Sequence, residues 1–189
     1  NLKKGLYDNY IRAFRWATDR IEENGIISFI TNGSFIDNQG MDGFRKSLLD
    51  EFTSVYVFNL RGNQRTSGEL SRKEGGKIFG SGSRTPVSIT CLIKNKKRKK
   101  DDFVHYYDIG DYLSREQKLT RIKKFESVKN IQWNIIKPDE NNDWINIRNA
   151  IFNKFINTIP QKKYDLTSNS YFNNYLVGIV SSRDAWAYN

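Results

Sequence analysis

The residues best suited to chemistry lie in one cationic, glycine-rich stretch, Val55–Lys94. Two apolar runs flank it, VYVFNL and PVSITCLI, and their β-branched and aromatic side chains are typical of strands. Because glycine lets the backbone come close to a ligand, this stretch favours binding to phosphate or nucleic acid. A solvated, mobile insertion is the alternative. Six cations lie between the two apolar runs, against only two glutamates: Arg61, Arg65, Arg72, Lys73, Lys77 and Arg84.

The composition narrows the class of partner. The chain has 189 residues and a formal net charge of +10, which favours a polyanionic partner. Its apolar share of 38% and aromatic share of 14% are those of a globular protein with room for one core and the start of a second domain. A single cysteine, Cys91, permits no internal disulfide and fits a reducing compartment. No apolar run approaches the roughly 20 residues of a membrane span, so we expect a cytoplasmic protein.

Helix and strand patterns alternate in the first part of the chain, as in an α/β fold. Apolar residues at steps of three and four predict a helix over Leu6–Glu23. Ile26–Thr31 is apolar on both faces, which suits a buried parallel strand. Phe44–Phe52 is the next predicted helix, with Asp42 as its cap. Residues 32–43 follow the carboxyl end of a strand, where such folds bind ligands, although an ordinary loop is the simpler interpretation.

The two apolar runs of the opening stretch are most simply antiparallel, which predicts a mixed sheet. Lys94–Lys100, KNKKRKK, is interpreted as the solvated tip of a hairpin, with a targeting signal or a phosphate patch as the alternatives. Ser114-Arg-Glu-Gln has the capping-box pattern and opens a predicted helix that ends near Phe125. Four more segments are predicted to be strands, a helix and a linker: Phe103–Ile109, Ile131–Ile136, Trp144–Ile156 and Pro160–Ser170.

Several common chemistries lack their motifs. Gly76-Lys77 has neither the upstream glycine nor the following Ser or Thr of a Walker loop, and no G-x-G-x-x-G follows a strand. No carboxylate pair suggests an acid–base couple. His105 is the only histidine and has no ligand set around it in the sequence, which argues against a metal site. The residues alone therefore indicate a basic α/β domain that binds nucleic acid.

The order of five segments adds a resemblance. GLYDNYIRAFRWA, GIISFITNGSFID, FRKSLLDEF, VYVFNLRGNQRTSGE and EGGKIFGSGSRTPVSITCLIK resemble the methyltransferase part of Type ISP restriction–modification enzymes. HYYDIGDYLSREQK and SRDAW belong to the same resemblance, which covers most of the chain. Those enzymes are single chains with nuclease, helicase, adenine-N6 methyltransferase and target-recognition regions.

The resemblance implies the second half of a Rossmann-like, S-adenosylmethionine-dependent methyltransferase, an α/β fold whose mixed sheet has antiparallel edge strands. It places Tyr7 and Asp8 near the cofactor pocket. It places Phe79 against a target adenine flipped out of double-stranded DNA, where an aromatic face offsets the lost stacking. Without the resemblance, Phe79 would be a core aromatic beside a strand. The residues expected to contact DNA are Arg61, Asn63, Arg65, Arg72, Lys73, Lys77 and Arg84.

The sequence also departs from the family pattern. The catalytic tetrad contains adjacent prolines, whereas Pro86, Pro138 and Pro160 are all isolated. The glycine-rich loop that holds the cofactor is absent as well. We therefore expect the chain to be a piece of a longer protein that has both motifs upstream. We expect no catalytic residue in the chain itself, and neither methylation nor useful cofactor affinity from the chain alone.

Two domains are expected, the C-terminal half of the catalytic domain over 1–128 and a mixed extension into the target-recognition region over 129–189. The implied partners are double-stranded DNA and the upstream half, helicase and nuclease regions of the parent protein. Two alternatives stay open: a non-enzymatic nucleic-acid-binding module, and a scaffold whose charge serves only solubility.

Overall fold

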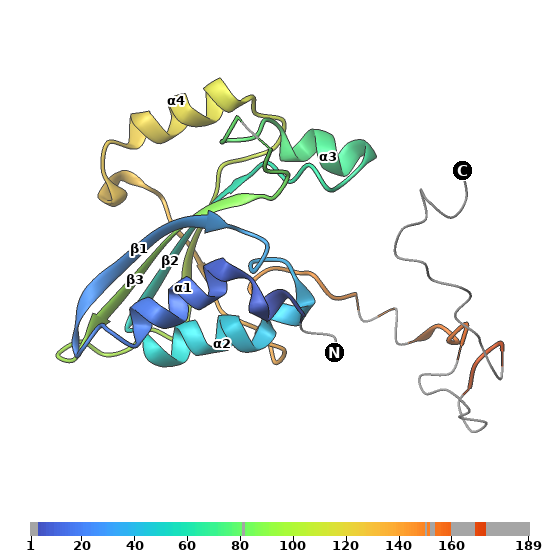
Figure 1. Ribbon diagram of the computed structural model, residues 1–189, viewed down its shortest axis with the longest axis horizontal. Coiled ribbons are helices and arrows are strands. Elements are labelled where there is room, and N and C mark those ends of the chain that lie inside the picture. Colours follow the sequence, from blue (N-terminus) through green and yellow to red (C-terminus); the bar gives the residue numbers. More distant parts are fainter. Residues whose placement is uncertain (1–3, 81, 150, 152–153, 160–168, 173–189) are drawn as a thin grey trace. The chain divides into compact units, whose positions relative to one another are not determined.

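The computed structural model describes residues 4–80, 82–149, 151, 154–159 and 169–172 (Figure 1). The chain divides into two units, Asn1–Ile147 and Arg148–Asn189. In the second unit the described residues include an isolated parallel bridge between Asn157 and Ser170. The candidate site lies wholly in the first unit.

The described residues of the first unit contain a five-stranded mixed sheet with the order β1-β3-β2-β4-β5. β3 lies between β1 and β2 and runs antiparallel to both. β4 pairs with β2 in parallel, and β5 closes the described sheet as an antiparallel partner of β4. The antiparallel pairing of the two apolar runs is thus confirmed. The strands are β1 Asn24–Asn32, β2 Ser54–Arg61, β3 Val87–Asn95, β4 Val104–Asp108 and β5 Asn134–Ile136.

Two helices cover one face of this sheet and form the main core (Figure 1). α1 spans Asn9–Thr18 after a short 3-10 turn, η1 Lys4–Tyr7, and α2 spans Asp42–Glu51 after η2, Gln39–Met41. The ring of Phe14 in α1 packs edge-on against Phe44 of α2, with ring centroids 5.3 Å apart. Phe35, which follows β1, packs against both rings and is fully buried, so it has a structural role.

Two further helices lie at the end of the sheet where β1, β2 and β4 finish (Figure 1). α3, Gly68–Glu74, interrupts the connection between β2 and β3, and α4, Arg115–Phe125, follows β4. The capping box at Ser114 and Gln117 is formed, which confirms the predicted start of α4. A second, smaller core lies here, and Ile78 from the β2–β3 connection packs in it with Phe58 and Ile109.

Three sequence predictions about strands need correction. β1 is not flanked by parallel strands among the described residues, because it pairs along its whole length with antiparallel β3. Nor is it buried on both faces, since Ile26 is 68% exposed. Residues 96–100 are exposed, as expected for a solvated turn, but they do not form a hairpin tip. The strand they lead to, β4, pairs with β2 and not with β3.

Two predictions about helices also need correction. α1 is shorter than the predicted Leu6–Glu23, and residues 144–149 are not helical. Trp144 is instead buried against Phe35, with ring centroids 5.9 Å apart. β5 extends the sheet past residue 128 within the first unit, and the division into two domains at that residue stays a prediction. The predicted linker and the segment ending in SRDAW lie largely or wholly outside the described residues.

None of the described helices is both long enough and apolar enough to cross a membrane.

Candidate nucleic-acid interface

The connection between β2 and β3, residues 62–86, leaves the sheet at the carboxyl ends of β1, β2 and β4. Open α/β sheets bind ligands at this edge. The connection contains α3 and most of the predicted DNA contacts, and it packs against the start of α4 through backbone hydrogen bonds. The amide of Gly76 donates to the carbonyl of Leu113 over 2.9 Å, and that of Tyr112 donates to Lys73 over 3.0 Å.

Two glycines make this contact possible. A Cβ atom on Gly75 would lie 2.2 Å from the carbonyl oxygen of Leu113, and one on Gly76 would lie 2.5 Å from the amide nitrogen of Arg115. Both are backbone atoms that cannot move aside easily. Gly75 also has a φ of +66°, which larger residues rarely adopt. These two glycines of the cationic loop therefore allow its backbone to pack closely against the backbone at the start of α4.

Lys118, in α4, forms hydrogen bonds to the same part of the β2–β3 connection. Its side chain is completely buried, and its ammonium donates to the carbonyls of Glu74 over 2.7 Å and Gly76 over 2.8 Å. Burial lowers the pKa of Lys118 to about 8, with Arg61 acting in the same direction and the charge of Glu74 opposing it. Sequence reasoning missed this residue, because a lysine on a cationic helix has the pattern of a solvated face.

Phe79 follows directly after this fixed segment. Ile78 is buried in the second core, and its carbonyl accepts a hydrogen bond from Nε of Arg115 over 2.9 Å. The next side chain, Phe79, is 52% exposed. The structure therefore removes the alternative that Phe79 is a core aromatic: an aromatic ring faces solvent beside backbone that is held from two sides.

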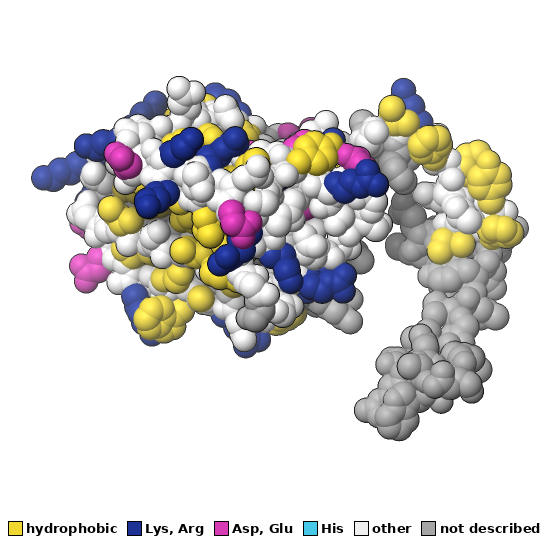
Figure 2. All heavy atoms as spheres, turned by 90° about the horizontal axis from the view of Figure 1, so that it is seen from above, with side chains coloured by type: hydrophobic (Ala, Val, Ile, Leu, Met, Phe, Trp, Pro, Cys, Tyr) yellow, Lys and Arg dark blue, Asp and Glu magenta, His cyan; other side chains and the backbone are white. Residues whose placement is uncertain are grey.

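The predicted DNA-contacting cations differ in how free they are. Arg65, Arg72, Lys73 and Arg84 are exposed, and Lys77 is half-buried. Arg72 pairs loosely with Glu69, and Arg84 donates to the carbonyl of Gln64 over 2.8 Å. On the face shown in Figure 2, lysine and arginine side chains are spread out, with hydrophobic side chains between them.

Arg61 and Asn63 are used differently from the expectation. The guanidinium of Arg61 forms ion pairs with Asp108, over 2.6 Å, and Asp111. Burial lowers the pKa of Arg61, but hydrogen bonds and charge from these two aspartates raise it overall. The side chain of Asn63 accepts from the backbone amide of Arg65 over 3.0 Å and so shapes the turn. We therefore remove Arg61 from the candidate interface and regard Asn63 as a turn residue.

Tyr7 and Asp8 lie at the amino-terminal end of α1. Because α1 runs antiparallel to β1, this end is at the same edge of the sheet as the β2–β3 connection. Both residues are exposed, and the side chain of Asp8 makes no capping bond to α1. The nearby Tyr10 hydroxyl is buried and has no hydrogen-bond partner among the described atoms. Tyr7 and Asp8 are therefore open to solvent at this edge, whereas the Tyr10 hydroxyl is closed off from it.

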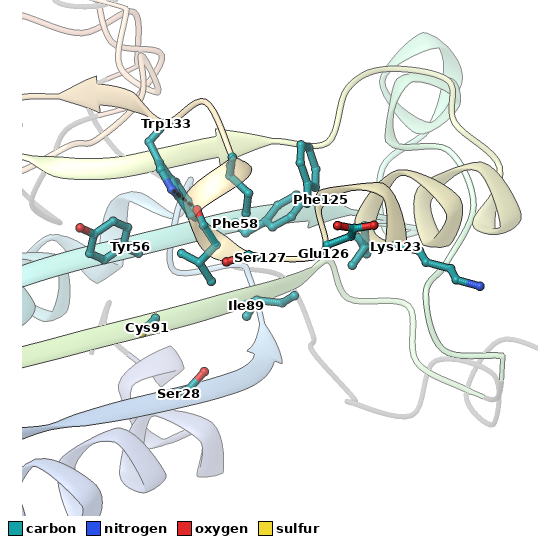
Figure 3. A pocket seen from close by; sticks show the side chains of 13 residues that line it. Ser28, Tyr56, Phe58, Ile89, Cys91, Lys123, Phe125, Glu126, Ser127 and Trp133 are labelled. Carbon is teal, nitrogen blue, oxygen red and sulfur yellow. Dashed lines mark hydrogen bonds between the residues drawn. The ribbon is translucent and has the colours of Figure 1, made fainter.

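The other face of the sheet carries an apolar cavity of about 420 Å³ that the sequence did not reveal (Figure 3). Ser28, Cys91 and Tyr56 line it from the neighbouring strands β1, β3 and β2. Phe125, the last residue of α4, and Trp133, in the segment that follows α4, border it. Burial raises the pKa of the Cys91 thiol. In the described part of the chain, no three His, Cys, Asp or Glu residues gather as metal ligands.

Solved structures similar to this chain include two DNA complexes of Type ISP restriction–modification enzymes. A nuclease-deletion mutant of LlaGI with a DNA substrate mimic is 50% identical over 96% of this chain, with a TM-score of 0.81. DNA-bound LlaBIII, an ATP-dependent enzyme, is 43% identical over 97% of the chain, with a TM-score of 0.85. The chain belongs to the Type ISP restriction–modification family. The protein in a DrdV–DNA complex is 31% identical to this Type ISP segment over 96% of the segment's length, with a TM-score of 0.81.

This Type ISP segment spans 14% of the LlaGI chain, 12% of the LlaBIII chain and 18% of the DrdV chain. No protein-family model matches it, and no curated protein does. The mixed α/β fold of the first unit is consistent with part of a methyltransferase-like fold.

Proposed function

We propose that the chain is the C-terminal half of the catalytic domain of a DNA adenine-N6 methyltransferase within a Type ISP enzyme. The observation that carries the proposal is the exposed ring of Phe79 on fixed backbone, at the ligand-binding edge of the sheet, in a segment similar to DNA-bound Type ISP enzymes. A base taken out of the duplex needs such an aromatic surface.

In this proposal Phe79 stacks on the extruded adenine while exposed cations of the same connection hold the DNA backbone. Arg65, Arg72, Lys73 and Arg84 are exposed on either side of the ring in the sequence. Phosphate contacts position the duplex without reading its sequence. The target sequence would be read mainly elsewhere in the protein.

S-adenosylmethionine would supply the methyl group that is transferred. The described residues offer only two exposed polar side chains to such a ligand, Tyr7 and Asp8, at the ligand-binding edge of the sheet. The glycine-rich loop and the proline-containing tetrad are not in this sequence. The chain alone is therefore expected to bind the cofactor poorly and to transfer no methyl group.

The upstream half of the same domain would complete the sheet. No described strand pairs with the outer edge of β1, and Ile26 and Ile30 on that strand are 68% and 59% exposed. An unpaired edge beside an exposed apolar face is a site for another segment to bind. The helicase and nuclease regions remain further partners implied by the family, and a cytoplasmic location remains an expectation.

A non-enzymatic nucleic-acid-binding module is the second candidate. The observation in its favour is that exposed cations are present while the tetrad is not. It predicts DNA binding without any modified base.

One experiment distinguishes the two candidates. The full-length protein is incubated with DNA and isotopically labelled S-adenosylmethionine, and the nucleosides are analysed by mass spectrometry. Our proposal predicts labelled N6-methyladenine from the full-length protein and none from the 189-residue chain alone. Label on cytosine, no label from the full-length protein, or N6-methyladenine made by the chain alone would contradict it.

A further inference from the structure

Phe79 is useful as a stacking surface only if its backbone is fixed before the base arrives. A ring on a mobile loop would lose conformational entropy on binding, whereas a ring on fixed backbone would not. In the described residues, side chains from the first turn of α4 bond to the backbone on the amino-terminal side of Phe79.

Lys118 is a buried cation that bonds to this backbone. Burying a lysine is costly unless its ammonium finds partners. Here both of its hydrogen bonds end on the β2–β3 connection, at the carbonyls of Glu74 and Gly76. A buried cation is thus retained for two backbone atoms that lie five and three residues before Phe79.

Arg115 bonds to the same backbone closer to Phe79. Its Nε donates to the carbonyl of Ile78, the residue next to Phe79, while the Ile78 side chain is held in the second core. Unlike Lys118, the Arg115 side chain is half exposed. The capping box fixes the helix start that carries both cations: the Ser114 amide donates to the Gln117 side chain over 2.7 Å.

We propose that Arg115 and Lys118 are positioning residues, which hold the carbonyls of Glu74, Gly76 and Ile78 and so fix Phe79 for stacking on the extruded adenine. This inference rests on the proposed function. It adds that α4 sets the position of the stacking residue without touching the base itself.

The test uses the full-length protein and a duplex with 2-aminopurine at the position that the wild-type enzyme methylates, because this base becomes fluorescent when it leaves the stack. The variants are Phe79→Ala, Arg115→Gln, Arg115→Lys and Lys118→Met. Lys124→Met is the matched control, since it removes an exposed positive charge from the same helix. Methylation kcat and KM for DNA are measured for each on the same duplex with adenine at that position, because 2-aminopurine has no 6-amino group, and the melting temperature is measured as well.

We expect Arg115→Gln and Lys118→Met to lower kcat about tenfold or more, because misplaced groups lose catalysis steeply. KM for DNA should change little, since the exposed cations remain. The 2-aminopurine signal should fall with kcat, and Arg115→Lys should recover part of both. Lys124→Met should behave as wild type. Because Arg115 and Lys118 act through Phe79, the double variant Phe79→Ala/Arg115→Gln should lose no more than Phe79→Ala alone.

The results distinguish a failure of the proposed function from a failure of the positioning role. If Phe79→Ala changes neither the signal nor kcat, the proposed function fails. If Phe79→Ala lowers both while Arg115→Gln and Lys118→Met match Lys124→Met, the positioning role is wrong. Losses that simply add in the double variant, or that follow a lowered melting temperature, would also overturn it, because they would indicate a general structural effect.

Discussion

Arg45 and Asp143 form an ion pair that is almost completely buried and ties the segment after β5 to the start of α2. The guanidinium also donates to the carbonyls of Phe35, Asn38 and Asn142, each over 2.8 Å. Such a pair matters most when one partner is removed, because the other is left as a buried charge.

We predict that Asp143→Asn destabilises the protein by about 3–5 kcal/mol, because the charge of Arg45 then remains buried without its counter-ion. Urea unfolding followed by tryptophan fluorescence measures this. Asp50→Asn is the control, since the exposed pair of Asp50 with Lys46 contributes at most about 0.5 kcal/mol. Equal unfolding midpoints for the two variants would contradict the account.

Lys118 predicts a pH dependence. Its pKa is about 8 in the folded protein because it is buried, and it returns to its ordinary higher value on unfolding. Between these values the unfolded state binds more protons, so the free energy of unfolding should rise with pH. The gain for wild type over Lys118→Met between pH 7.5 and 9.5 is about 2 kcal/mol. Parallel pH curves for the two proteins would refute the low pKa.

Residue types predicted the candidate site only in part. The glycines and cations of the connection were visible, but Phe79 was singled out only through the family resemblance. Arg61 looked like the other cations, and nothing in its neighbours along the chain revealed Asp108 and Asp111 as its partners. Arg115 and Lys118 gave no signal, because their bonds are made to carbonyls more than 35 residues away in the sequence.

At the scale of elements, the sequence predicted those helices and strands that depend on residues close together in the chain. The capping box at Ser114 predicted α4, and the apolar runs predicted β2, β3 and β4. The short α3 was missed, because its exposed, polar residues have no apolar stripe. The pairing of β4 with β2 could not be predicted either, since it depends on a strand that is not adjacent in sequence.

The β2–β3 connection predicts a salt dependence of DNA binding. Each phosphate contact that is lost should reduce the slope of log affinity against log salt by about one. Arg65→Ala and Lys73→Ala should each do so, as they remove exposed cations of the connection. Lys46→Ala on α2 removes an equal charge away from this edge and should leave the slope unchanged. Binding isotherms of the full-length protein at several salt concentrations measure it, and equal slopes for all three variants would exclude the connection as the DNA contact.

At the scale of the whole molecule, the sheet has one face covered by α1 and α2 and another with an apolar cavity and an exposed β1. The sequence predicted the mixed sheet, but the continuous apolar run of β1 could not show which partners the chain itself provides. The proposed upstream half accounts for the exposed side chains on that strand.

Cys91 reports on this arrangement, because it lines the cavity on the exposed face. The raised pKa of the thiol slows maleimide attack in both proteins. We predict that a maleimide modifies Cys91 more slowly in the full-length protein, where the upstream half would cover it, than in the 189-residue chain. Peptide mass spectrometry follows Cys91 specifically, and a urea-unfolded sample gives the unprotected rate. Equal rates in chain and full-length protein would contradict the covering.

If Phe79 stacks on an extruded adenine, the rate of adenine-N6 methylation by the full-length protein depends on its ring. Phe79→Ala should lower kcat about tenfold or more, because stacking on one base contributes about 1–3 kcal/mol, and Phe79→Tyr should retain most of the rate. Leu70→Ala is the matched control, since Leu70 is an equally apolar side chain of the same connection and is 65% exposed. A Phe79→Ala enzyme that methylates adenine as fast as the Leu70→Ala enzyme would contradict the account.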